Sequence, residues 1–149
     1  MFIYITWDTI YGCISISKMK PLTSNINFVN FDENIAAYAK YDDEGVAVIN
    51  VPNNINELYF FFTTLELGGR YSKEVYLYCY KTYQDAEERA LDFLDDEHNR
   101  NDDCDECEET GSNEDCANYM LKQLKDRGYA SFNPSDYEET TIYIKKFTI

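Results

Sequence analysis

The sequence is short of histidine, of basic residues and of long hydrophobic runs. Its 149 residues include one histidine, and 13 Lys and Arg side chains stand against 28 acidic ones, which gives a net charge of −15. Lys and Arg displace counterions from phosphates, so this charge opposes direct binding to nucleic acid or to an anionic membrane surface. The same charge favours encounter with a basic surface on another protein.

No hydrophobic run approaches the length of a membrane span. The longest apolar stretches, such as residues 59–62, are far shorter than the roughly 18–20 residues that cross a bilayer. The N-terminus has no basic region before its apolar residues, as a secretion signal would. We therefore expect a cytoplasmic or otherwise intracellular, non-secreted protein that does not associate with membranes.

The sequence also lacks the short signatures of catalysis. Nucleophilic Ser or Cys catalysis usually needs a histidine base, and His98 is the only histidine. No Gly-x-Ser-x-Gly, His-Glu-x-x-His or phosphate-loop pattern occurs, and the many acids single out no catalytic pair. We expect a protein that is not an enzyme.

What the chain does have is material for a core. Hydrophobic residues make up 44% of the sequence and aromatic residues 16%, including 14 Tyr and 9 Phe. A chain of this length is typical of one domain, so we expect residues 1–149 to form a single domain. Strand patterns come first and helical patterns later. This order predicts an α+β fold, with a mainly antiparallel sheet built from hairpins and two helices in the C-terminal half packed on one face.

Two hairpins are predicted in the N-terminal third. Residues 2–7 follow the period-two pattern of a strand, and residues 13–17 alternate between a polar and an apolar face, with a turn at 8–12 between them. Residues 37–41 and 46–49 suggest a second hairpin that turns at Gly45. A short helix over 33–40 is the competing interpretation of that segment.

Residues 57–65 are ambiguous between helix and strand. Their apolar positions fit helical spacing, whereas their aromatic and Thr content favours a buried strand, which is the interpretation adopted here. Residues 75–80 would be the partner strand. Its three tyrosines, Tyr76, Tyr78 and Tyr80, are expected on a packed sheet face.

Two helices and a last strand are predicted beyond residue 80. The first helix starts at Thr82 as N-cap and runs to about His98. The second starts at Ser112, in a Ser-x-x-Asp capping arrangement, and stops at Gly128. Residues 141–144 alternate as a strand that could join the sheet.

Negative charge concentrates between residues 81 and 118, which hold 15 acidic and 3 basic side chains. On the first helix one face is acidic and the opposite arc, with Ala86, Ala90, Phe93 and Leu94, is apolar. Like charges at i,i+3 and i,i+4 repel, so this face costs stability, which suggests that it serves a partner. The predicted partner-binding residues are Asp85, Glu88, Asp92, Asp95, Asp96, Asp102, Asp103, Asp105 and Glu106.

The loop at about 95–115 between the helices also gathers cysteines. The order is His-x5-Cys-x2-Cys-x8-Cys, formed by His98, Cys104, Cys107 and Cys116. A Cys₃His set suits one structural zinc, although acidic neighbours disfavour the thiolates that zinc needs. Reduced thiols and a disulfide are the alternatives, and no other cofactor is expected. Cys13 and Cys79, on predicted strands, are expected to be small core residues.

These features favour a non-enzymatic acidic module that engages a basic surface of a partner protein. In its sharpest form it is a nucleic-acid-mimic inhibitor of a DNA- or RNA-handling protein, comparable in size and charge to small acidic anti-defence proteins of phages and viruses. The alternative is a structural or assembly subunit of a virion or larger complex. In that case aromatic sheet faces make the contacts, and the Cys/His loop is a zinc-stapled or solvating insertion. The sequence alone leaves the oligomeric state open.

Overall fold

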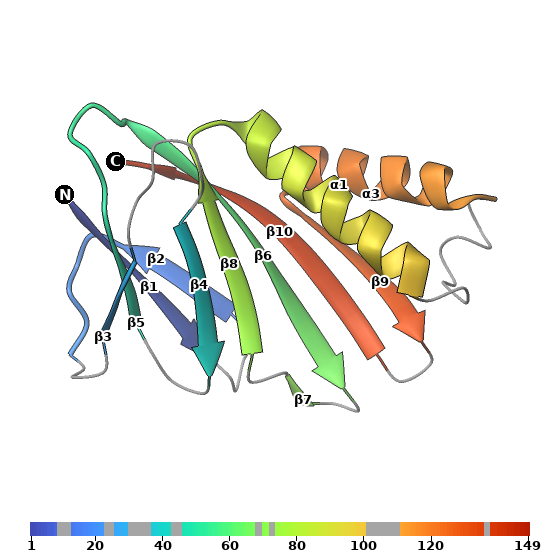
Figure 1. Ribbon diagram of the computed structural model, residues 1–149, viewed down its shortest axis with the longest axis horizontal. Helices are drawn as coiled ribbons and strands as arrows, with labels where there is room; N and C mark the ends of the chain where they lie inside the picture. Colours follow the sequence, from blue (N-terminus) through green and yellow to red (C-terminus); the bar gives the residue numbers. More distant parts are fainter. Residues whose placement is uncertain are drawn as a thin grey trace.

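The computed structural model describes residues 1–8, 13–22, 26–29, 37–42, 46–67, 70–71, 74–100, 111–135 and 138–149 (Figure 1). These residues form ten strands and two long helices. In chain order the elements are β1 (Phe2–Asp8), β2 (Cys13–Ser17), β3 (Ile26–Val29), β4 (Ala37–Asp42), β5 (Val46–Asn50), β6 (Glu57–Leu67), β7 (Arg70–Tyr71), β8 (Glu74–Tyr80), α1 (Tyr83–Arg100), α3 (Asn113–Arg127), β9 (Tyr129–Ser135) and β10 (Glu138–Thr148).

The strands belong to two sheets. Sheet A has the order β2-β1-β5-β3, in which β1 pairs antiparallel with β2 and β5 while β3 pairs parallel with β5. Sheet B has the order β4-β8-β6-β10-β9, with the short β7 beside β6, and all its pairs are antiparallel. The fold is therefore α+β, as the sequence predicts, but its strands form two sheets rather than one.

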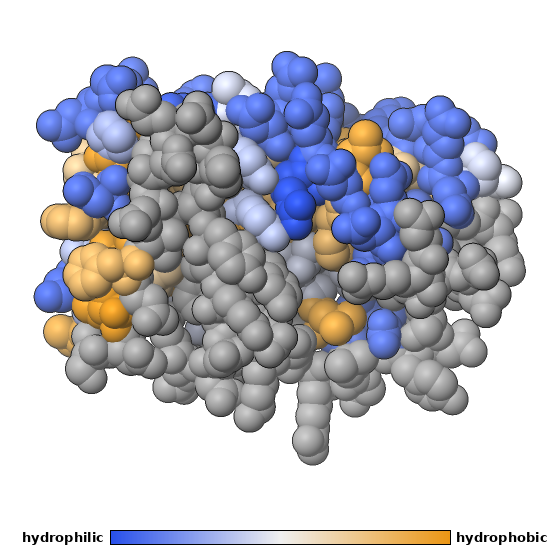
Figure 2. All heavy atoms as spheres, viewed as in Figure 1, coloured by the Kyte–Doolittle hydropathy of each residue, from blue (hydrophilic) through white to orange (hydrophobic). Residues whose placement is uncertain are grey.

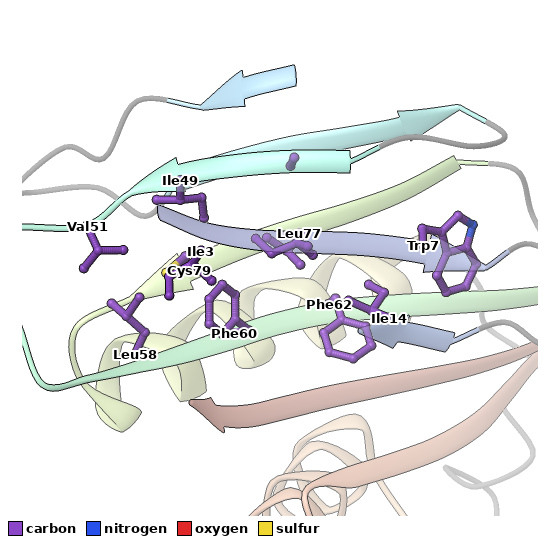
Figure 3. Close-up of a cluster of buried hydrophobic side chains, with 12 residues drawn as sticks. Ile3, Trp7, Ile14, Ile49, Val51, Leu58, Phe60, Phe62, Leu77 and Cys79 are labelled. Atoms are coloured by element: carbon purple, nitrogen blue, oxygen red, sulfur yellow. The ribbon is translucent and has the colours of Figure 1, made fainter. Parts of the chain in front are cut away.

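The first core lies between the two sheets (Figure 3). Sheet A contributes Ile3, Ile5, Trp7, Ile14, Ala47 and Ile49, and sheet B contributes Leu58, Phe60, Phe62, Leu77 and Cys79. Cys79 is the small core residue that its strand position predicts, and burial raises the pKa of its thiol to about 12. The thiol therefore stays protonated and unreactive at neutral pH.

The second core lies on the other face of sheet B, where both helices pack. Ala86, Ala90 and Leu94 of α1 and Met120 and Leu124 of α3 are fully buried there. They contact a row of sheet residues formed by Phe61, Ala130, Phe132, Ile142 and Ile144. The two helices thus cover one face of the sheet, as expected, and sheet A covers part of the other face.

This double burial explains the ambiguous segment 57–65, which is the strand β6. Phe60 and Phe62 point to the first core and Phe61 to the second, so three consecutive aromatic side chains are all buried. A strand covered on both faces loses the alternation that identifies a half-exposed strand. The predicted pairing with residues 75–80 is confirmed, with Phe62 opposite Leu77. Tyr78 and Tyr80 are packed against the helical layer, as expected, and the side chain of Tyr76 lies outside the described residues.

The predicted hairpin over residues 35–51 is wrong. Both strands exist, but β4 pairs with β8 in sheet B whereas β5 lies between β1 and β3 in sheet A. Four of the five residues of β5 are buried, and this burial demands a central position that a two-stranded hairpin does not provide. Residues 37–40 are strand rather than helix, and residues 43–45, which include the expected turn at Gly45, lie outside the described residues.

The other element predictions are confirmed. The N-terminal hairpin pairs Ile5 with Ile16 and Trp7 with Ile14. The last strand, expected over 141–144, is longer and runs as β10 along the whole of β6. In the part of the chain that the structure describes, no helix is long and apolar enough to cross a membrane.

Candidate functional site

Helix α1 begins at a hydrogen-bonded cap. The Thr82 hydroxyl oxygen accepts a hydrogen bond from the Asp85 amide at 3.1 Å, and the same hydroxyl donates to the Asp85 carboxylate at 2.6 Å. This arrangement satisfies an amide that the first helical turn leaves without a backbone partner. Thr82 is thus the N-cap, as the sequence predicts, and the cap fixes the start of the acidic face.

The burial of α1 sets which side faces solvent. Ala86, Ala90 and Leu94 recur at helical spacing and are buried against sheet B, and Phe93 packs edge-on against Phe132 with ring centroids 6.4 Å apart. The opposite face is turned outward. Hydrophilic side chains cover much of the helical layer in Figure 2.

All five predicted acidic residues of α1 are exposed. We call this set the α1 stripe, and it consists of Asp85, Glu88, Asp92, Asp95 and Asp96. Glu88 accepts a hydrogen bond from the Gln84 side chain at 3.3 Å. With the described residues, Asp92, Asp95 and Asp96 form neither a hydrogen bond nor an ion pair. Their charge is therefore directed to solvent.

Arg89 lies in the middle of α1 but does not neutralise the stripe. Its guanidinium donates to the Tyr78 hydroxyl at 2.7 Å, and its Cζ atom lies 4.1 Å from the centroid of the Tyr78 ring. The charge is thus held against β8 as a cation–π pair. Arg89 makes no ion pair with any described carboxylate, so the α1 stripe keeps its negative charge.

The predicted zinc ligands are only partly described. His98 at the end of α1 is 4% exposed, and desolvation lowers its pKa while the nearby Asp95 opposes that shift. Cys116 on α3 is buried in the core between the helices and sheet B. Cys104 and Cys107 lie outside the described residues, and the described residues contain no cluster of three His, Cys, Asp or Glu side chains that could hold a metal. The zinc site stays a prediction.

The acidic loop is likewise outside the described residues, and with it Asp102, Asp103, Asp105 and Glu106. The described site is therefore the helical part alone.

Sequence reasoning missed one member of the α1 surface. Leu91 is 36% exposed and lies between Glu88 and Asp95 along the helix. Its position outside the apolar arc was readable from the helical period. It gives the α1 stripe an apolar contact as well as charge.

Comparison with protein-family models, with curated proteins and with solved structures gave no match.

Proposed function

We propose that this protein is a non-enzymatic binding module whose α1 stripe engages a basic surface on a partner protein. The observation that carries the proposal is the uncompensated charge of α1. The five acids of the α1 stripe are exposed, and the one base within their span, Arg89, is held against Tyr78. Electrostatic complementarity of this kind speeds encounter and selects partners by charge.

In its strongest form the partner is a protein that handles DNA or RNA. Glu88, Asp92 and Asp96 recur every four residues, so their carboxylates repeat about every 6 Å along the helix axis. The basic groove of a nucleic-acid-binding protein accepts a regular row of negative charges, and a helix carries such a row in a fixed geometry. The module would then inhibit by occupying the groove.

The test is affinity capture from lysate of the source cells. Bound proteins are eluted with a salt gradient, and the capture is repeated with excess DNA. The proposal expects a nucleic-acid-handling protein that leaves the column at moderate salt and is displaced by DNA. Partners that resist salt and ignore DNA would contradict the mimic form.

A charge-reversed variant makes the test specific to α1. It carries Glu88→Lys, Asp92→Lys, Asp95→Lys and Asp96→Lys, and it spares Asp85 because the Asp85 carboxylate accepts a hydrogen bond from the Thr82 hydroxyl at the N-cap. The matched control reverses four acids elsewhere that are also exposed, namely Glu114, Asp115, Asp126 and Glu139. The α1 variant should lose the partner and the control should keep it.

A second candidate function is that of an assembly subunit, and apolar exposure on sheet A favours it. Met19 is 80% exposed and Phe28 is 77% exposed, with Met1, Phe2 and Leu22 also exposed nearby in the chain or sheet. Exposed apolar groups of this kind mark protein contacts. A subunit of this type should associate in high salt, and Phe28→Ser with Met19→Ser should abolish that association. The Cys/His loop would then be a zinc-stapled or solvating insertion.

A further inference from the structure

On the side of sheet B that faces away from the helices, the described part of the β9 edge contributes nothing to the first core, whereas Tyr143 of β10 packs partly against that core. The helices cover Ala130 and Phe132 of β9 and Ile142 and Ile144 of β10. Neighbouring residues point to the opposite side of a strand, so Tyr129, Tyr143 and Lys145 face away from the helices. The described part of β9 contributes no side chain to the core beneath sheet A, and Tyr129 is 42% exposed.

This side carries a row of cations and aromatic rings. The Arg127 guanidinium carbon lies 4.2 Å from the Tyr129 ring centroid, and the Tyr129 and Tyr143 centroids are 6.3 Å apart. Lys145 Nζ lies 5.9 Å from the Tyr143 centroid. We call these four residues the cationic–aromatic face.

The row is held in place from several directions. Arg127 donates to the Tyr129 carbonyl oxygen at 3.0 Å and to the Gln123 side chain at 2.8 Å. Tyr143 stacks on the buried Phe62 with centroids 4.7 Å apart. A surface ordered before binding loses less conformational entropy when a partner docks.

The cationic–aromatic face spans two adjacent strands. Arg127 directly precedes Gly128 and β9, whereas Lys145 lies on β10 and leans toward Phe62 on β6. The face therefore presents two cations beside a pair of aromatic rings.

The α1 stripe carries the complementary charge. Glu88 and Asp95 are seven residues apart, which is about 10.5 Å along a helix axis. The exposed Leu91 lies between them on the same face. The two acids and the leucine of α1 therefore complement, in charge and in apolar character, the two cations and the aromatic pair on sheet B.

We propose that this protein associates with a second copy of itself, head to tail, through these two surfaces. Glu88 and Asp95 of one copy pair with Arg127 and Lys145 of the next, and Leu91 packs on Tyr129 and Tyr143. The two surfaces lie on opposite sides of sheet B, so one chain cannot satisfy its own pair. Contacts of this heterologous kind propagate into chains or rings.

The net charge of −15 does not forbid this contact at physiological salt. The screening length there is about 8 Å, so charges in direct contact outweigh distant ones. The contact is small and partly polar, and we expect a dissociation constant between about 10 μM and 1 mM.

The inference shares the α1 stripe with the proposed function, but its test acts on the other surface. The double variant Arg127→Glu and Lys145→Glu leaves α1 unchanged. Its matched control is Lys18→Glu with Lys20→Glu, two exposed lysines after β2 in sheet A that change the net charge equally. Capture of a basic partner through α1 should be the same for both, so the two proposals can fail separately.

The experiment is sedimentation velocity between about 10 μM and 1 mM protein at physiological salt, the range set by the expected affinity. The wild-type protein and the Lys18/Lys20 control should sediment faster as concentration rises. The Arg127/Lys145 variant should sediment as a monomer, its affinity lowered by about tenfold or more. A monomeric wild-type protein, or equal loss in the control, would overturn the proposal.

A mixture of two charge-reversed variants distinguishes loss of the contact from misfolding of a variant. A second variant, Glu88→Lys with Asp95→Lys, should also be monomeric alone. Mixed in equal amounts, the two charge-reversed variants should associate again, because the reversed helix meets the reversed sheet face. If neither variant associates alone and the mixture stays monomeric, the assigned surfaces are wrong.

Discussion

Helices α1 and α3 pack on the same face of sheet B but differ in the charges that they carry toward their C-terminal ends. In α3, Glu114 and Asp115 lie in the first turn and Lys125 and Arg127 in the last, which complements the helix dipole at both ends. In α1, Asp95 and Asp96 lie toward the C-terminal end, where negative charge opposes the dipole. Glu88, Asp92 and Asp96 also repel one another at i,i+4 spacing.

The two helices are otherwise alike, and this makes the difference informative. Each starts at a side-chain cap, Thr82 or Ser112, and each buries a strip of small and aliphatic residues against sheet B. Asp85 supports the N-cap of α1, but Asp92, Asp95 and Asp96 form no hydrogen bond or ion pair with the described residues that would stabilise the helix. The charges of α3 support its helix, whereas the acids toward the end of α1 cost stability. Such a cost suggests that the α1 acids serve contact with another molecule.

The largest expected effect tests whether α1 and α3 contribute equally to the free energy of unfolding. Leu94→Ala on α1 and Leu124→Ala on α3 each remove a buried side chain, 0% and 1% exposed, from the second core. Each should lower the free energy of unfolding by about 2–5 kcal/mol, as lost burial and a cavity require. Urea denaturation measures both. A small effect of Leu94→Ala beside a large effect of Leu124→Ala would show that α1 is only loosely docked.

The caps come next. The amides of Asp85 and Asp115 donate to the hydroxyls of Thr82 and Ser112, both at 3.1 Å. Thr82→Ala and Ser112→Ala should each cost about 1 kcal/mol. Thr82→Ser is the control that keeps the hydroxyl and should restore most of the loss. Thermal unfolding followed by circular dichroism measures all three variants, and an unstable Thr82→Ser variant would contradict a capping role.

A smaller effect should differ in sign between the helices. Asp92→Lys replaces repulsion from Glu88 and Asp96 with attraction and should stabilise the protein by about 0.5–1 kcal/mol. Asp115→Lys puts a cation in the first turn of α3 and should destabilise it by a similar amount. Both changes are measured by urea denaturation at low ionic strength. If Asp92→Lys destabilises the protein, the α1 acids contribute to folding and the argument for a partner loses its basis.

The smallest expected effect is a pH dependence from His98. Its pKa is lowered from 6.5 in the folded state by desolvation, so the unfolded chain binds a proton more readily. The stability that this group contributes is complete above pH 6.5 and declines as the pH falls toward the lowered folded pKa. The difference in unfolding free energy between wild type and His98→Gln should therefore shift against wild type below pH 6.5. A difference independent of pH would place His98 in a more hydrated setting.

Sequence patterns predicted the helices and strands better than the pairing between strands. The helices and the strands β1, β2, β6, β8 and β10 were readable because their apolar periods or caps are local. The pairing of β4 and β5 was not, because their separation into two sheets is decided by burial of β5 among strands far away in the sequence. The strand β9 was missed because Gly128 and Pro134 frame only two buried apolar residues, Ala130 and Phe132. Pro134 is tolerated there since β9 is an edge strand.

The candidate site was predicted to a similar degree. The exposure of the α1 stripe follows from the helical period of Ala86, Ala90 and Leu94. The orientation of Arg89 does not, because its partner Tyr78 lies on a strand whose position under α1 is a tertiary feature. The cationic–aromatic face needs β9 and β10 side by side and so could not be found without the fold.

The most direct test of the central claim compares the two charge-reversed proteins in the same capture experiment. One carries the four α1 substitutions at Glu88, Asp92, Asp95 and Asp96, and the other carries the four substitutions at Glu114, Asp115, Asp126 and Glu139. Both have the same net charge, and both should show cooperative unfolding. The account predicts that partners displaced by salt are lost from the α1 variant and retained by the control. Equal retention by both variants would contradict it.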